Sequence, residues 1–318
     1  MAKQRIIALE EHFWVPALRD RFTGFHRVRG HQPNVRLTDL GQGRIAEMDE
    51  AGIDVQVLSH VQPGPQVFDA ETSVTLAREA NDLLAEACRA RPDRLAGFAA
   101  LPTPDPKAAA DELERTVTRY GFKGAMINGL TNGAFIDEKR FWPIFERAEA
   151  LDVPIYLHPA IPHQQVIDAY FKDYLQGDYP ILMGAVWGFN VETSTQVLRL
   201  MLSGVFDKHP KLKFIIGHMG ETIPFSLWRL DWTVRHLTGR EGFADLFRTH
   251  FWITTSGNFS NPALICSLLE LGAERIMFSV DYPYNSNVAG VAFVNNAPIS
   301  PSDREKIFAG NAAALLRL

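Results

Sequence analysis

Residues 113–127 read LERTVTRYGFKGAMI, and this stretch contains the unit from which most of the chain is built. Its first part has helical character up to Tyr120, and Gly121 can adopt the left-handed conformation that ends a helix. The apolar run at 125–127 is typical of a short buried strand. The order helix, turn, strand recurs at least five times, with helical segments at residues 45–51, 113–120, 141–151, 192–202 and 262–271.

The apolar runs that follow these helices are continuous rather than alternating, which indicates strands buried on both faces. Such strands form parallel sheets that are covered by helices. Eight runs qualify, at residues 5–9, 55–58, 95–101, 125–127, 153–157, 212–216, 251–255 and 275–280. We therefore predict an α/β fold, a (β/α)8 TIM barrel, in a single domain over residues 1–318. No Gly-x-Gly-x-x-Gly sequence opens a helix, so a dinucleotide-binding fold is not supported.

Two long stretches interrupt the repeat, one at residues 23–38 after the first strand and one at 159–188 after the fifth. Because both follow strands, we expect them at the C-terminal mouth of the barrel, where functional loops of this fold lie. The second stretch carries the aromatic residues Tyr170, Phe171, Tyr174, Tyr179 and Trp187. These side chains could form a lid that excludes water, or they could form a subunit interface.

Composition excludes several functional classes. The net charge of −5 comes from interspersed acidic and basic residues, without the basic stripe that nucleic acid requires. Cys88 and Cys266 are the only cysteines and form no CxxC pair, so neither a disulfide framework nor a thiolate zinc site is expected, and a reducing cytoplasm fits best. The apolar segment at 6–10 is too short for a signal peptide or a membrane span.

Residues that bind divalent metals follow or end four of the predicted strands. Glu10 and His12 close the first, His158 the fifth, His218 the sixth and Asp281 the eighth. Strand ends of a barrel converge on one mouth, and the i, i+2 spacing of Glu10 and His12 places both on one face of the strand while Glu11 points away. Carboxylates and imidazoles together suit zinc or another first-row divalent ion. We therefore predict one metal-centred site at the mouth.

Three other histidines are expected to be structural. His209 and His250 precede strands and so belong to the opposite floor of the barrel, and His236 lies within a helical segment.

Several motifs resemble those of a known family. They read ALEEHF at 8–13, RPDR at 91–94, GFAALP at 97–102, NG at 128–129, YLHP at 156–159, GHMGE at 217–221, WR at 228–229 and FSVDYPY at 278–284. Together they span nearly the whole chain. The sequence resembles the amidohydrolase superfamily, in the subgroup related to aminocarboxymuconate-semialdehyde decarboxylase, and within it the hydroxybenzoate decarboxylases such as γ-resorcylate and 2,3-dihydroxybenzoate decarboxylase.

This resemblance implies roles for individual residues. Glu10, His12, His158 and Asp281 would bind a single divalent ion, with Zn or Mn expected and no organic cofactor. The first motif has Glu-x-His where most hydrolytic members of the superfamily have His-x-His, which matches the decarboxylases. His218 would be catalytic and Glu221 would orient it.

The implied reaction is a reversible, non-oxidative decarboxylation of a hydroxybenzoate-type acid. Asp281 would protonate the ring carbon that bears the carboxylate, so that carbon dioxide leaves from a tetrahedral centre. Asn128, Arg229, Phe13 and Tyr284 are the expected substrate-binding residues. For Arg229 a surface or intersubunit salt bridge is the alternative, and Phe13 and Tyr284 could instead be core aromatics.

Two other functions stay open at this stage. The same metal and His218 could activate water against a lactone, ester or amide, as in hydrolytic members of the superfamily. A barrel that serves only as a binding or assembly module would be expected to have lost its ligands, whereas all the matched ligand positions are intact. The resemblance also implies a homodimer or homotetramer that acts on a small aromatic carboxylic acid.

Overall fold

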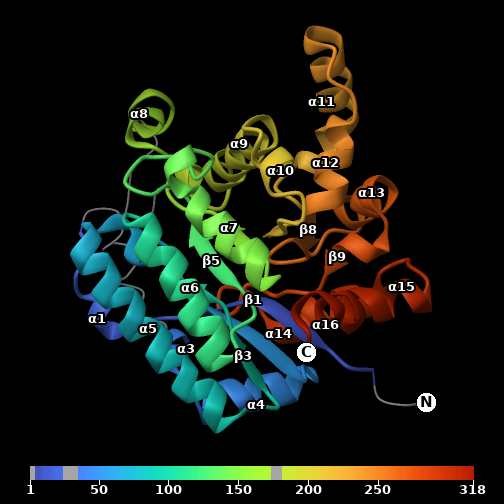
Figure 1. The fold of residues 1–318 in the computed structure, drawn as a ribbon. Coiled ribbons are helices and arrows are strands. Elements are labelled where there is room, and N and C mark those ends of the chain that lie inside the picture. The colour runs from blue at the N-terminus through green and yellow to red at the C-terminus, as the bar shows by residue number, and fades with distance from the viewer. Residues whose placement is uncertain (1–3, 24–34, 173–180) are drawn as a thin grey trace.

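The computed structural model describes residues 4–23, 35–172 and 181–318. Short strands lie at the centre of the molecule and helices surround them (Figure 1). The strands are β1 (Ile7–Phe13), β2 (Val55–His60), β3 (Leu95–Gly97), β4 (Ala99–Ala100), β5 (Ala125–Asn128), β6 (Ile155–His158), β7 (Phe214–Ile216), β8 (Phe251–Thr254) and β9 (Ile276–Met277).

All neighbouring strands pair in parallel, in the order β1-β2-β3 in one sheet and β4 to β9 in the other. The two sheets meet at Phe98, whose N–H donates to the carbonyl of Leu58 at 2.8 Å, so β3 and β4 are two halves of one strand. The ring closes where Leu9 bridges Ser279 in parallel and its N–H donates to the carbonyl of Phe278 at 3.2 Å. The predicted (β/α)8 barrel is therefore confirmed, with the expected third strand split in two.

The helices cover the outside of this barrel. The longer ones are α4 (Gln42–Ala51), α5 (Ala70–Ala90), α6 (Pro106–Tyr120), α7 (Trp142–Leu151), α9 (Gly188–Leu202), α11 (Ile223–Thr238), α12 (Phe243–His250), α13 (Asn261–Leu271) and α14 (Asn287–Asn296). Shorter α-helices are α1 (Pro16–Arg19), α3 (Val35–Thr38), α8 (Gln164–Val166), α10 (Val205–Lys208), α15 (Pro301–Glu305) and α16 (Asn311–Leu316). Among the described residues, no helix combines the length and apolarity needed to cross a membrane.

Local sequence explains where several helices begin and end. The Asp69 and Asp105 carboxylates accept backbone N–H groups in the first turns of α5 and α6, which satisfies donors that have no partner inside a helix. Gly52 and Gly121 end α4 and α6 with φ values of 75° and 71°. These are the left-handed helix ends that the sequence predicts at both glycines.

The barrel interior and the space between strands and helices form separate cores. Alternate strand residues, including Leu9, Val57, Phe98, Met126 and Ile215, point inward and pack together with Tyr156. Residues of α16 belong to the same cluster and close its floor. The intervening residues pack outward against the helices. The barrel is thus solid below its mouth, and only the C-terminal ends of the strands are free to form a site.

The two long stretches lie partly outside the described residues, as do Tyr174 and Tyr179. In the described parts, Phe171 is buried, whereas Tyr170 and Trp187 are 72% and 51% exposed. Exposure of this size is compatible with both the lid and the subunit interface, so that choice stays a prediction.

Candidate metal centre

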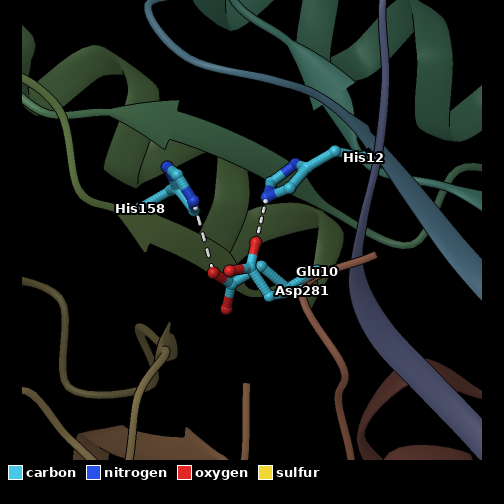
Figure 2. A group of neighbouring side chains, drawn as sticks. All are labelled: Glu10, His12, His158 and Asp281. Carbon is cyan, nitrogen blue, oxygen red and sulfur yellow. Dashed lines mark ion pairs between the residues drawn. The ribbon is translucent and has the colours of Figure 1, made fainter. Parts of the chain in front are cut away.

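Four side chains from three distant segments meet at the mouth of the barrel. Glu10 and His12 come from β1, His158 ends β6, and Asp281 follows β9 (Figure 2). Each offers one ligand atom, and these atoms all lie within 4.8 Å of one another. His158 Nε2 is 3.3 Å from Glu10 Oε1, and His12 Nε2 is 3.2 Å from Asp281 Oδ1. The structure therefore brings together the four residues that were predicted to bind metal.

An irregularity in β1 shapes this cluster. Between Ala8 and Glu11 the register against β2 shifts, so β1 contains one residue more than its partner over this interval. Glu10, at the bulge, has a φ of 58°. A bulge re-aims the side chains around it and is common next to functional sites. It turns Glu10 toward His158 while His12 still reaches Asp281.

Gly217, which directly follows β7, leaves the space that the Glu10 carboxylate occupies. A Cβ at this position would lie 2.5 Å from Glu10 Oε2 and 3.2 Å from both Cδ and Oε1. Real Cβ atoms essentially never approach another atom more closely than 3.0 Å. A side chain at position 217 is therefore incompatible with the observed position of Glu10.

The donor set fits a divalent cation. Glu10 and His12 are fully buried, and Glu10 Oε1 and His12 Nε2 have no hydrogen-bond partner among the described residues. Buried polar atoms are costly when unpaired, so an ion between them is the natural partner. Two carboxylates and two imidazoles at one barrel mouth suit Mn, Zn and related ions.

Further residues hold the ligands in place. The Tyr156 hydroxyl hydrogen-bonds Glu10 Oε2 and also lies 2.9 Å from Thr254 Oγ1. On the other ligand, Ser59 Oγ lies 3.3 Å from His12 Nδ1, which leaves Nε2 facing the cluster. Hydrogen bonds of this kind fix the orientation of metal ligands.

The electrostatics of the cluster favour an ionised Glu10. Burial alone would raise the pKa of Glu10, but the neighbouring imidazoles of His218, His158 and His12 lower that pKa to about 2. Burial lowers the pKa of His158, which favours its neutral, metal-binding form. Glu10 is thus charged and His158 is neutral at neutral pH, as metal binding requires.

His218 and Glu221 form a pair beside the cluster. His218 Nδ1 is 2.5 Å from Glu221 Oε1, and its Nε2 is 3.4 Å from Glu10 Oε1. Burial lowers the pKa of His218, but the negative charges of Glu221 and Glu10 outweigh this effect and raise it to about 10. A divalent cation bound at the cluster would instead lower the pKa of His218. Glu221 is fully buried and holds the ring so that Nε2 points at the site.

The backbone around the pair is unusual. His218, Met219, Glu221 and Thr222 all have φ values between 50° and 70°, in the left-handed region that residues other than glycine rarely adopt. Asp281 has a φ of 69°. Such residues persist only where the surrounding structure holds them, and they gather at functional sites.

The four expected substrate-binding residues have different surroundings. Asn128 ends β5, is 3% exposed, and has a buried Oδ1 without a hydrogen-bond partner among the described residues. The ring of Tyr284 lies 6.1 Å from that of His12 and is partly exposed at the mouth. Phe13 is buried against His60, with ring centroids 5.5 Å apart. The structure thus places Asn128 and Tyr284 at the mouth and Phe13 within the apolar core.

Arg229 lies apart from the other three. It is an exposed residue of α11, a helix that stands out from the body at the top of the view (Figure 1). It makes no ion pair or hydrogen bond with any residue that the structure describes.

A cavity of about 670 Å³ opens at the mouth. Its wall includes Asn128, whose neighbour across the β5–β6 register is His158, but the four clustered side chains themselves do not line it. Both long stretches contribute to it, the first through Thr23 and the second through His163. The cavity is large enough for a substituted benzene ring.

The histidines expected to be structural are distant from the cluster. His209 Nδ1 is 3.1 Å from Glu149 Oε2, and His250 Nδ1 is 2.8 Å from the Leu212 carbonyl oxygen. His236 stacks on Trp232 in α11.

Three residues with roles at the site were not identified from the sequence, namely Tyr156, Arg44 and Glu11. Tyr156 precedes His158 by two residues on the same face of β6, and that spacing was a usable signal. Arg44 is fully buried and donates through Nη2 to the His12 carbonyl at 2.6 Å. Nothing in the sequence of α4 indicates this contact, because it depends on how the helix packs against β1.

Comparison with known proteins gives consistent similarities. Residues 11–318 match the model of a family described as Amidohydrolase. A γ-resorcylate decarboxylase from Rhodococcus jostii (strain RHA1) is 43% identical, over 98% of this chain and 98% of that protein.

Solved structures agree with the sequence relatives. A dihydroxybenzoic acid decarboxylase from Polaromonas sp. JS666, with bound manganese and the inhibitor 2-nitroresorcinol, superposes with a TM-score of 0.91 at 39% identity and covers 99% of this chain and 98% of its own. A 5-carboxyvanillate decarboxylase from Sphingomonas paucimobilis gives a TM-score of 0.92 at 38% identity, with 99% of this chain and 100% of that chain covered.

Proposed function

This chain belongs to the amidohydrolase family, and on that premise we propose that it is a divalent-metal-dependent decarboxylase of a hydroxybenzoate-type acid. The observation that carries the proposal is the cluster of Glu10, His12, His158 and Asp281, in a chain that resembles hydroxybenzoate decarboxylases over its whole length. Loss of carbon dioxide makes it a carboxy-lyase. We also propose that residues 1–318 form a single amidohydrolase-type barrel domain.

We assign the four residues of the cluster as ligands of one ion, with manganese favoured because it is present in the Polaromonas structure. When bound, the ion supplies positive charge that neutralises the substrate carboxylate and an adjacent phenolate oxygen. A hydroxyl ortho to the carboxylate is therefore a requirement for the substrate. The aromatic ring would then extend from the ion toward Asn128 and the cavity that this residue lines.

Asp281 is the proposed proton donor. Its carboxyl gives a proton to the ring carbon that bears the carboxylate, and that carbon becomes tetrahedral. The bond to the carboxylate then breaks, its electron pair restores the aromatic ring, and carbon dioxide leaves. Asp281 recovers its proton from solvent, so the net reaction consumes one proton for each carbon dioxide released. In the reverse direction the same carboxylate takes the proton from the ring.

We propose that His218 donates a hydrogen bond to an oxygen of the substrate. Its Nε2 faces the cluster, and Glu221 holds Nδ1, so the ring presents one N–H in a fixed direction. A positioned acid or base of this kind typically contributes about 10²- to 10⁴-fold in rate. Asn128 and Tyr284, at the mouth, are the better placed of the expected substrate contacts.

The test is a panel of benzoates in D2O with the manganese-loaded protein. Acids with an ortho hydroxyl, such as 2,6- and 2,3-dihydroxybenzoate, should lose carbon dioxide and gain one deuterium at the vacated carbon, whereas 4-hydroxybenzoate should not react. A hydrolase would instead open a lactone with incorporation of ¹⁸O from labelled water. Failure to decarboxylate any 2-hydroxybenzoate, together with such hydrolysis, would refute the proposal.

We also propose that the protein is a homodimer or homotetramer. Helix α11 stands out from the body (Figure 1) and carries Phe225, Trp228, Trp232 and Leu237, which are 85%, 71%, 45% and 74% exposed. A monomer rarely leaves so many large apolar side chains in water. Light scattering should give a mass of two or four chains, and Trp228→Ser should weaken the assembly. A monomeric wild-type protein would contradict this.

We also propose a cytoplasmic location, which the two free cysteines, Cys88 and Cys266, support.

A further inference from the structure

Glu11 lies between two proposed ligands in the sequence, yet its carboxylate turns to a neighbouring segment. Oε1 accepts a hydrogen bond from the Val280 peptide N–H at 2.9 Å, and Oε2 accepts one from the Tyr282 N–H at 3.0 Å. The residue between these two donors is Asp281. One side chain thus binds the peptide groups on both sides of a proposed ligand and proton donor.

The carbonyl groups of the segment that Glu11 binds have donors of their own: the His12 N–H donates to the Tyr282 carbonyl at 2.7 Å and the Gly257 N–H to the Val280 carbonyl at 3.3 Å. Glu11 supplies acceptors for the N–H groups of the same residues. Strand β9 ends at Met277, and beyond it a single parallel bridge, from Leu9 to Ser279, continues the pairing with β1. The peptide groups of 280 and 282 therefore need an acceptor other than a sheet ladder, because buried N–H groups are rarely left unpaired. Asp281 itself has a φ of 69°, a conformation that persists only where the surrounding structure holds it, and its Oδ2 accepts a hydrogen bond from Asn285 Nδ2 at 3.2 Å.

Arg44 contacts both of these segments. Its Nη2 donates to the His12 carbonyl at 2.6 Å, and its guanidinium lies 4.6 Å from the centre of the Tyr282 ring. Glu11 and Arg44 are both fully buried. The Arg44 guanidinium thus contacts both His12, which follows Glu11, and Tyr282, which follows Asp281.

We propose that Glu11 is a positioning residue, which sets the place of the Asp281 carboxylate relative to His12, Glu10 and His158. This inference rests on the proposed metal centre. Asp281 Oδ1 is 3.2 Å from His12 Nε2, so a small rotation of the segment around residue 281 would move it out of the cluster. Both Glu11 carboxylate oxygens accept peptide N–H groups, so the proposed role of Glu11 is exerted through the backbone that carries Asp281.

The variant that tests this is Glu11→Gln. A glutamine keeps the shape of the side chain, but its NH2 group cannot accept a hydrogen bond, so one of the two peptide groups loses its acceptor. Loss of a residue that orients a metal ligand typically weakens metal binding about 10- to 100-fold. We expect a loss of this size in Mn²⁺ affinity and a changed electron paramagnetic resonance spectrum of bound Mn²⁺, in a protein that still folds.

Glu112→Gln is the matched control. Glu112 is also a buried carboxylate with its oxygens engaged, by Asn81 Nδ2 at 2.8 Å and by Arg115 Nη2 at 2.7 Å, but it joins α5 to α6 outside the barrel. Its replacement should lower the melting temperature and leave Mn²⁺ affinity and the spectrum unchanged. A purely structural role for Glu11 predicts the same behaviour for both variants.

Two results would overturn the proposal. One is Glu11→Gln with wild-type Mn²⁺ affinity and spectrum. If that variant does not fold, Glu11→Asp, which keeps the charge but is shorter by one methylene, takes its place, and wild-type Mn²⁺ binding by it is the second. Since the measured quantity is metal binding, a wild-type protein that binds Mn²⁺ but decarboxylates nothing would refute the proposed function and leave this test intact.

Discussion

Gly217→Ala tests whether the position of Glu10 controls the site. The added methyl carbon would lie 2.5 Å from Glu10 Oε2, whereas ordinary van der Waals contact begins at 3.4 Å. Gly217 is not among the glycines with positive φ, so the backbone itself accepts alanine. All three of the nearest atoms belong to the Glu10 carboxylate, and the perturbation therefore falls on that one group.

The expected magnitude follows from this distance. Glu10 must withdraw by about 0.9 Å, the difference between 3.4 and 2.5 Å, to reach ordinary contact. A displacement of about 1 Å in a catalytic constellation can cost about 10²-fold in rate, which is about 2.7 kcal/mol in the activation free energy. We expect kcat/KM to fall roughly 100-fold, with weaker Mn²⁺ binding.

The assay compares Gly217→Ala with Gly310→Ala. At Gly310 the nearest atom to an added Cβ is the Glu305 carbonyl oxygen, at 3.7 Å, so this control should keep full activity. Decarboxylation of a dihydroxybenzoate is followed at saturating Mn²⁺, and circular dichroism checks the fold. A folded Gly217→Ala protein with wild-type turnover and Mn²⁺ affinity would refute the reasoning.

Three further predictions follow from individual contacts. His218→Asn should lower kcat about 10²- to 10⁴-fold while the manganese content of the purified protein stays the same; loss of manganese in parallel would make His218 a ligand instead. Tyr156→Phe removes a hydrogen bond to the Glu10 carboxylate, for which about 1.5–3 kcal/mol is typical, so Mn²⁺ affinity measured by titration should fall about 10- to 100-fold, and an unchanged affinity would contradict this. Burial raises the pKa of Glu192 to about 7 from 4.5, so its ionisation destabilises the fold as pH rises through this range. Glu192→Gln should therefore be up to about 3 kcal/mol more stable than wild type in urea unfolding at pH 8 and no more stable at pH 4, whereas an equal difference at both pH values would exclude this cause.

The fold could be predicted because barrel strands are buried on both faces. Continuous apolar runs such as 55–58 and 125–127 coincide with β2 and β5, and Gly52 and Gly121 end helices as expected. The boundaries were harder to predict. The first strand continues to Phe13, well beyond its apolar run, because polar Glu10, Glu11 and His12 are buried there by contacts with other segments.

The core of the site could also be predicted, because strand ends of a barrel converge. The two-residue spacing of Glu10 and His12 correctly placed both in one cluster with His158 and Asp281. The bulge at Glu10 has no counterpart in the sequence pattern.

Supporting contacts could not be predicted in the same way. Glu11 was expected only to point away, but it accepts two peptide N–H groups of a segment about 270 residues later in the chain. Arg44, in helix α4, donates to the carbonyl of His12, the residue after Glu11. Spacing rules describe which side chains share a face of one element, whereas these bonds depend on the packing between elements.

The central claim is that four side chains bind one ion at the mouth of the barrel. Anomalous diffraction from Mn²⁺-soaked crystals, recorded on both sides of the manganese edge, tests it most directly. One strong peak should lie between Glu10, His12, His158 and Asp281, at about 2.0–2.3 Å from an oxygen or nitrogen of each. A crystal with bound manganese elsewhere, or with no peak among these residues, would contradict the claim.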